Sequence, residues 1–314
     1  MIDNELAVRM QHLVAERQPF VLATVVRARR PTSVTPGNAA LVLSDGTIDG
    51  FVGGVCAESS VRLQSLRAME TGEPLLLRLV PGDDDSGEAA DTIYGAVVEH
   101  NPCLSGGALE IFLEPHLPAA RLVIIGDSPI AHALERVGQA AGYECHLSSA
   151  SAPAAVDGAA AVDGAAAVIV ASHGSGEETV LAAALTAGIP YVALVASSKR
   201  GAVVRAELEV ADQLRSQLHT PAGLNIGARS PREIAISILA ELIAEQRAHP
   251  APGRTENELV VPSAVEVAID PVCGMRVAVT SATPKLIAGG EPVFFCGEAC
   301  RDRYAREHSD AIVA

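Results

Sequence analysis

The sequence predicts an α/β protein in three parts: a small N-terminal α+β domain, a central parallel-sheet domain and a short C-terminal unit that contains half of the cysteines. Three observations support this prediction. The 314 residues exceed a single small module, because domains hold roughly 100 to 200 residues. Hydrophobic residues make up 49% and charged residues 19%, so cores can form. Aromatic residues supply only 3%, so those cores must be aliphatic, as in parallel sheets.

Composition also narrows the function classes. Asp and Glu number 38 against 23 Lys and Arg, a net charge of −15, so a broad electrostatic grip on nucleic acid phosphates is excluded. No run approaches the roughly 18 to 20 apolar residues of a membrane helix, and residues 1–20 lack the apolar core of a signal peptide. We therefore expect a cytoplasmic protein with no membrane or nucleic acid partner. In that compartment the six cysteines should be ligands or reactive thiols.

The first domain, residues 1–118, is predicted to be a small sheet with one central helix. Strands are expected at 20–28, 39–43, 47–52, 75–80 and 108–113, with a hairpin turn at 44–46. After the break at Gly53-Gly54, the spacing of apolar residues predicts a helix that begins near Cys56. A thiol at a helix start faces unpaired N–H groups and the positive end of the helix dipole, which favour the thiolate. Cys56 is therefore a candidate nucleophile or soft-metal ligand, with an inert buried cysteine as the alternative.

The second domain, residues 119–247, alternates strands and helices, which predicts a parallel sheet with right-handed crossovers. Strands are expected at 122–125, 143–147, 167–171 and 191–195, and helices at 130–141, 177–187 and from Pro231 onward. Ser230 and Glu233 have the spacing of a capping box at the start of the last helix.

The turn at Gly126 lies where a Rossmann-like domain binds the pyrophosphate of a dinucleotide. Ser128 replaces the glycine that lets the backbone approach the ligand, and no carboxylate follows at the distance expected for the ribose contact. We therefore expect a Rossmann-like scaffold for which NAD(P) is an improbable ligand. A dinucleotide-like ligand held in another way is the alternative.

The C-terminal unit, residues 267–314, follows an aperiodic linker at 248–266. It holds Cys273, Cys296 and Cys300 with C-x22-C-x3-C spacing, and three thiols in so small a unit predict a soft cation such as zinc. A metal would also replace part of the core that so short a unit lacks. The fourth ligand stays open: His308 is the nearest candidate, and water or a substrate atom would serve equally.

Several motifs resemble known families. The segments PTSVTPG (31–37), GGVCAE (53–58) and PCLSGGALEIFLEP (102–115) resemble the N-terminal domain of the XdhC/CoxI family. Residues 218–242 resemble the C-terminal Rossmann domain of that family, and the similarity spans roughly residues 1–247. The segments DPVCGM (270–275) and FFCGEAC (294–300) resemble a YHS domain, a treble-clef-like metal-binding module.

The first resemblance implies a maturation factor for molybdenum hydroxylases. Such a protein would bind molybdenum cofactor transiently, assist its sulfuration and help insert it into an apo client of the xanthine dehydrogenase or carbon monoxide dehydrogenase type. A cysteine desulfurase is an implied further partner, and a homodimer is compatible with the resemblance. The chain would then be a chaperone rather than a turnover enzyme. Two other functions stay open: an NAD(P)-dependent oxidoreductase, and a metal sensor or metallochaperone that acts through the C-terminal cysteines.

The resemblance also assigns site residues. The reactive side chains that would act on the cofactor are those of Cys56, Glu58 and Cys103. The residues that would bind the cofactor are Gly53, Gly54, Gly106, Gly107, Gly126 and Ser128. Val55 stands where the family usually has a third glycine, which adds a side chain beside the thiol.

Overall fold

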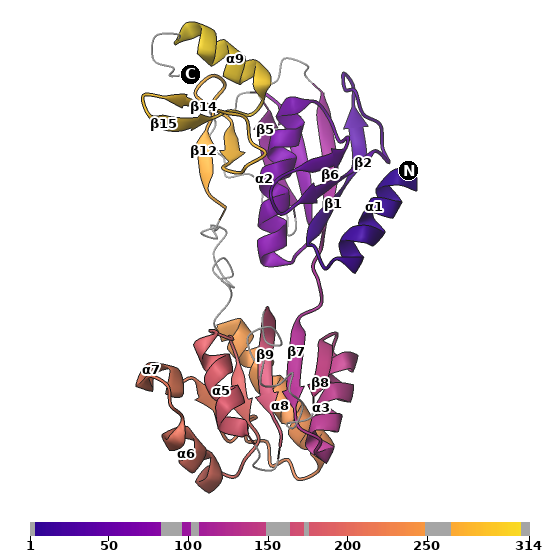
Figure 1. Ribbon diagram of the computed structural model, residues 1–314. Helices are drawn as coiled ribbons and strands as arrows, with labels where there is room; N and C mark the ends of the chain where they lie inside the picture. Colours follow the sequence, from indigo (N-terminus) through magenta and orange to yellow (C-terminus); the bar gives the residue numbers. More distant parts are fainter. Residues whose placement is uncertain are drawn as a thin grey trace. The chain divides into compact units, whose positions relative to one another are not determined.

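The computed structural model describes residues 4–82, 96–101, 107–148, 164–172, 176–248 and 265–308. The chain divides into two compact units (Figure 1). Unit 1 combines residues 1–118 with 251–314, and unit 2 comprises residues 119–250. A mixed sheet in unit 1 and a parallel sheet in unit 2 confirm the expected α/β class.

Unit 1 is built on a six-stranded sheet with the strand order β3-β2-β1-β6-β4-β5. Its strands are β1 (Phe20–Arg29), β2 (Ala39–Leu43), β3 (Ile48–Gly50), β4 (Leu75–Pro81), β5 (Ala96–Asn101) and β6 (Ala108–His116). β1 pairs antiparallel with β2 and β6, whereas β4 and β5 are parallel. The expected hairpin is confirmed, since β2 and β3 are antiparallel and the Leu43 N–H donates to the Thr47 carbonyl at 2.9 Å.

Alternation along β1 places apolar side chains on both faces of this sheet. Val21 and Ala23 join the buried cluster on the α2 face, whereas Phe20 and Leu22 join the cluster that includes Leu13 of α1. The helices are α1 (Asn4–Ala15) and α2 (Val55–Thr71). The expected start of a helix at Cys56 is thus confirmed to within one residue.

The C-terminal segment packs in unit 1 against α2 (Figure 1). It consists of β12 (Val267–Ile269), β13 (Arg276–Ala278), β14 (Lys285–Ala288), β15 (Glu291–Phe294) and α9 (Glu298–Glu307). β12 pairs antiparallel with β13, and β14 with β15. Ala278 lies in a buried cluster with Leu63 and Leu66 of α2, so part of the small core of this segment is supplied by the N-terminal domain.

Unit 2 contains a five-stranded parallel sheet with the order β11-β10-β9-β7-β8. Its elements are β7 (Arg121–Ile125), α3 (Pro129–Ala140), β8 (Glu144–Ser148), β9 (Ala165–Val170), α5 (Glu177–Thr186), β10 (Val192–Leu194), α6 (Ser198–Glu207), α7 (Asp212–Arg215), β11 (Leu218–His219) and α8 (Pro231–Ala248). Helices α3 and α8 cover one face, and α5 and α6 cover the other. The strand order reverses between β7 and β9, and such a switch point opens a crevice at the carboxyl ends of the strands.

The capping box of α8 is confirmed. The Ser230 hydroxyl accepts the Glu233 N–H at 3.3 Å, and the Glu233 carboxylate accepts the N–H groups of Ser230 and Arg229, both at 2.8 Å. These hydrogen bonds lower the pKa of Glu233. Within the described ranges, none of the helices combines the length and apolar character needed to cross a bilayer.

Candidate functional site

Cys56 lies in the first turn of α2, directly after the N-cap Gly54 and Val55. The N–H groups of this turn have no intrahelical acceptor, and the positive end of the helix dipole lies here. Cys56 borders a cavity of about 660 Å³, a size typical of small-molecule sites. The cavity is lined by Pro31, Thr32, Ser33, Gly54, Val55, Cys56, Ala57, Leu79, Gly107 and Leu109. The thiol therefore combines an electropositive surrounding with access to a ligand-sized space.

The other residues predicted to contact the cofactor lie in three places: near Cys56, in unit 2, or outside the described residues. Gly107 lies at the cavity wall, and a Cβ there would stand 2.0 Å from the carbonyl oxygen of Pro31, so only glycine fits. Glu58 is half-buried; burial raises the pKa of its carboxyl, and the nearby Arg62 opposes this shift. Cys103 and Gly106 lie outside the described residues.

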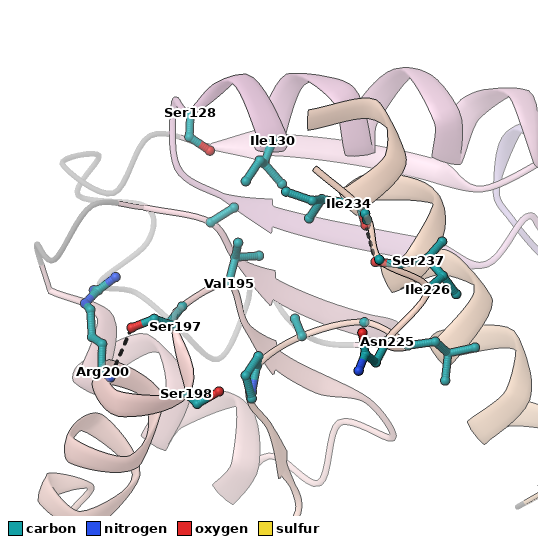
Figure 2. A pocket seen from close by; sticks show the side chains of 18 of the residues that line it. Ser128, Ile130, Val195, Ser197, Ser198, Arg200, Asn225, Ile226, Ile234 and Ser237 are labelled. Carbon is teal, nitrogen blue, oxygen red and sulfur yellow. Dashed lines mark hydrogen bonds between the residues drawn. The ribbon is translucent and has the colours of Figure 1, made fainter. Parts of the chain in front are cut away.

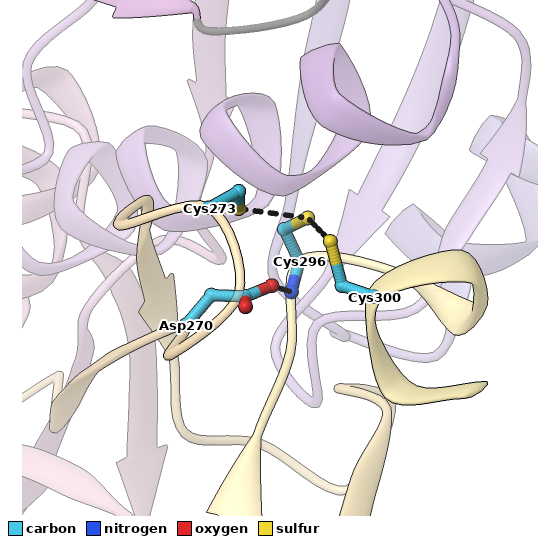
Figure 3. Close-up of side chains that lie close together, drawn as sticks. All are labelled: Asp270, Cys273, Cys296 and Cys300. Carbon is cyan, nitrogen blue, oxygen red and sulfur yellow. Dashed lines mark hydrogen bonds between the residues drawn. The ribbon is translucent and has the colours of Figure 1, made fainter. Parts of the chain in front are cut away.

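A second group of side chains converges at the start of α9 (Figure 3). The Cys296 sulfur lies 3.6 Å from the Cys273 sulfur and 3.6 Å from the Cys300 sulfur. Zinc–sulfur bonds of about 2.3 Å in a tetrahedron give sulfur–sulfur edges of about 3.8 Å, whereas a disulfide measures about 2.05 Å. No disulfide joins the cysteines of the described residues. The three thiols, which we call the thiol cluster, therefore have the spacing of a soft-metal site.

Asp270 is the fourth residue of this group, and sequence analysis did not include it. Its donor oxygen and the three sulfurs lie within 4.8 Å of one another. The carboxylate is fully buried and accepts the N–H groups of Val272 at 2.8 Å and Cys296 at 2.7 Å. Burial acts to raise its pKa, but these hydrogen bonds outweigh it, and the pKa of Asp270 is lowered.

His308, the candidate fourth ligand, lies apart from this group of donors. It forms the C-cap of α9. Its exposed ring stacks on Tyr304 with centroids 4.1 Å apart, and its Nδ1 lies 3.1 Å from the Tyr304 carbonyl oxygen.

The thiols of the cluster influence one another's protonation. A hydrogen bond joins the thiols of Cys273 and Cys296, and it lowers the pKa of Cys273 and raises that of Cys296. Burial raises the pKa of Cys300 to about 12. A cation must therefore displace protons to bind here, and its affinity will rise with pH.

Cys56 contacts the thiol cluster from the α2 side. It packs against the apolar group formed by Met275, Val277 and Cys296, and its thiol is a hydrogen-bond partner of the Cys296 thiol. Sequence analysis placed Cys56 and the C-terminal cysteines in separate sites. The structure instead places Cys56 beside the thiol cluster, although Cys56 lies outside the group whose donor atoms are all within 4.8 Å of one another.

Unit 2 contains a cavity of about 740 Å³ at the carboxyl ends of its strands (Figure 2). Ser128 lies at its edge, where its hydroxyl accepts the Ala131 N–H at 3.1 Å and caps α3. Arg200 also lines the cavity, but its guanidinium is paired with the buried carboxylate of Glu177. Gly126 is not among the described residues that line this cavity, and a Cβ added to it would lie 2.5 Å from the Ala171 carbonyl oxygen.

Two family models match this chain, one in the predicted N-terminal domain and one in the predicted Rossmann-like domain. Residues 13–79 match the XdhC and CoxI family, and residues 122–242 match the XdhC Rossmann domain. These matches confirm the resemblance over residues 13–79 and 122–242.

Two curated relatives and one solved structure are also similar to this chain. The chain is 30% identical over 260 residues to the uncharacterized protein YqeB of Escherichia coli K12, an alignment that covers 75% of this chain and 44% of YqeB. The chain thus spans less than half of that relative. It is 25% identical over 273 residues to the molybdenum cofactor insertion chaperone PaoD of the same organism, covering 73% of this chain and 84% of PaoD. The crystal structure of a xanthine dehydrogenase from Bacillus halodurans shares 18% identity and a TM-score of 0.39, covering 79% of this chain and 97% of that one.

Proposed function

We propose that this protein is a maturation factor that binds molybdenum cofactor transiently, assists its sulfuration and helps insert it into a molybdenum hydroxylase of the xanthine dehydrogenase or carbon monoxide dehydrogenase type. The observation that carries the proposal is the Cys56 thiol, at the start of α2 and on the wall of a ligand-sized cavity. The two XdhC-type matches and the similarity to PaoD support the same function. The protein would act as a chaperone rather than as a turnover enzyme.

The residues of the cavity suit an anionic cargo that contains molybdenum. The Cys56 thiolate would supply a soft ligand for the metal or for its sulfur. The positive end of the α2 helix dipole would stabilise negative charge on the cargo. Glu58 follows two residues later, and burial raises the pKa of its carboxyl, whereas the nearby Arg62 opposes this shift.

We further propose that the C-terminal segment is a YHS-type domain that binds zinc or another soft cation through Cys273, Cys296 and Cys300. The 3.6 Å sulfur spacings support this proposal. The same cluster favours a second candidate function, a metal sensor or metallochaperone that acts through these cysteines. The proposed partners are an apo molybdenum hydroxylase and a cysteine desulfurase, and the proposed location is the cytoplasm.

The decisive experiment is to purify the wild-type chain and two variants from a host that makes molybdenum cofactor. Molybdenum is measured by elemental analysis, and the pterin by fluorescence after oxidation. We expect both in the wild type and in Cys145→Ala, whose cysteine lies in β8 of unit 2, and neither in Cys56→Ala. A wild-type protein without molybdenum and pterin would refute the proposal.

Insertion and sulfuration need a second assay. The loaded protein is mixed with an apo molybdenum hydroxylase, with and without a cysteine desulfurase, and the activity of the client is followed. We expect activation that depends on both proteins. Activation by free cofactor at the same rate as by the loaded chain would count against a chaperone role.

A further inference from the structure

We propose that Cys56 is the fourth thiolate ligand of the metal site formed by Cys273, Cys296 and Cys300. This inference rests on the proposed binding of a soft cation by the C-terminal segment and adds to it: the N-terminal domain would complete the coordination shell. Cys56, which is predicted to contact the molybdenum cofactor, would then belong to the same site as the three predicted metal ligands.

The contacts of the two other candidates favour Cys56 as the fourth ligand. Asp270 belongs to the group of donors within 4.8 Å of one another, but each of its oxygens already accepts a backbone N–H, from Val272 and Cys296, and a soft cation prefers a thiolate to a carboxylate. His308 stacks on Tyr304 at the far end of α9. The Cys56 thiol, in contrast, already contacts the Cys296 thiol.

Packing holds the two segments together at this point. A Cβ built on Gly297 would lie 1.9 Å from Cγ1 of Val55, so the valine next to Cys56 fills the space that the glycine next to Cys296 leaves. A second close approach lies nearby, where a Cβ on Gly46 would stand 2.8 Å from the hydroxyl of Thr280. The start of α2 and the C-terminal segment therefore fit each other closely.

The electrostatics of the site also suit four thiolates. A divalent cation and four thiolates sum to a charge of −2, which must be offset in a partly buried place. Two helix starts meet here, because Cys56 lies in the first turn of α2 and Cys300 in the first turn of α9. Their N–H groups and dipoles favour negative charge. Each thiol that still carries a proton releases it to solvent when its metal–sulfur bond forms.

A shared ligand couples metal binding to the cavity of unit 1. When Cys56 is bound to the cation, its sulfur is not available to a ligand in the cavity. Metal occupancy would therefore decide whether the Cys56 thiol is available to a ligand in the cavity.

The first test measures the number of thiolate ligands in the full-length protein. Cobalt(II) is titrated into the metal-free wild type, Cys56→Ala and the matched control Cys145→Ala, and the sulfur-to-cobalt charge-transfer absorption is recorded. We expect Cys56→Ala to keep about three quarters of the intensity per cobalt, as one of four thiolates is lost. Its zinc affinity, measured by competition with a chelator, should fall at least about tenfold, since even outer-shell changes cost 10- to 100-fold.

The possible outcomes distinguish the role of Cys56 as a ligand from the proposed binding of a soft cation by the C-terminal segment. If Cys56→Ala binds cobalt and zinc like the wild type, Cys56 is not a ligand, although the C-terminal segment still binds metal. If the wild type binds neither ion, both proposals fail. The control variant should match the wild type in both measurements.

The second test keeps all four thiols and separates the two segments. Gly297 has an extended backbone (φ −172°, ψ 173°), so alanine is tolerated there except for its clash with Val55. We expect zinc to protect Cys56 from iodoacetamide in the wild type, as mapped by mass spectrometry, and to protect it much less in Gly297→Ala. The double variant Val55→Gly/Gly297→Ala should regain the protection. Equal protection in wild type and Gly297→Ala would overturn the inference.

Discussion

Replacing Gly126 by alanine tests the geometry of the switch point in unit 2. This residue follows β7 with a φ of +134°, and an added Cβ would lie 2.5 Å from the Ala171 oxygen, 2.7 Å from its carbonyl carbon and 2.8 Å from the Ser172 nitrogen. All three are backbone atoms, so no side chain can rotate away. Hydrogen bonds from Gly126 N–H to the Ser148 carbonyl at 2.8 Å and from Ala171 N–H to the Ile125 carbonyl at 2.7 Å hold the turn on both sides.

Two penalties therefore add up for Gly126→Ala. A non-glycine residue with such a φ costs about 1–3 kcal/mol, and forcing a methyl group into a packed contact costs typically about 1–3 kcal/mol more. The expected loss of unfolding free energy is about 2–6 kcal/mol. Gly142→Ala is the matched control, because Gly142 has a φ of +88° but nothing within 4 Å of the added Cβ. It should show the backbone penalty alone.

Urea unfolding monitored by hydrogen-exchange mass spectrometry reports on unit 2 by itself, through peptides from β7 and β9. We expect Gly126→Ala to lose at least about 1 kcal/mol more than Gly142→Ala, the lower bound of the packing penalty. Equal losses in the two variants would refute the close approach between the β7 turn and the end of β9.

Four further outcomes are expected. Titration calorimetry with NAD and NADP should show weak or no binding, because the Ser128 side chain stands where a bare backbone is needed; micromolar binding would revive the oxidoreductase. Asp270→Asn should destabilise the C-terminal segment by about 1–3 kcal/mol, since an amide cannot accept both backbone N–H groups; hydrogen exchange in β12 and β13 measures this, and unchanged exchange would contradict it. The pKa of Glu233 is lowered below its usual 4.5, so its stabilising effect is complete above that value and is lost as the pH falls through the folded pKa; a stability difference between wild type and Glu233→Gln that grows on acidification would contradict this sign. Chelation of metal from the full chain should raise hydrogen exchange in α9, as metal binding is linked to folding; protection indifferent to chelator in metal-loaded protein would argue against a metal that supports folding.

Local signals made much of unit 2 predictable. The alternation of strands and helices predicts its parallel sheet, and the spacing of Ser230 and Glu233 predicts the start of α8. Both patterns depend on residues close together in the sequence. The order of strands in unit 1 was beyond such signals. β6 lies between β1 and β4, and this pairing depends on contacts between residues far apart in the sequence.

The candidate site was predictable in its parts but not in its assembly. The glycine turn marked Cys56 and the cysteine spacing marked the thiol cluster, since both are properties of short segments. Their contact depends on the packing of β13 against α2, which no short segment encodes. Asp270 was missed because its role comes from backbone N–H groups that any residue could present.

The fit between Val55 and Gly297 links the residue choices at two distant positions. An XdhC-type chain without the C-terminal segment has no equivalent of Gly297 for the side chain at position 55 to contact. A glycine at position 55 therefore loses no packing in such a chain. In a chain that has this segment, a side chain at position 55 adds packing only when the residue before α9, here Gly297, has no side chain. Transplanting this segment onto another XdhC-type domain would therefore require the valine to be transplanted with it.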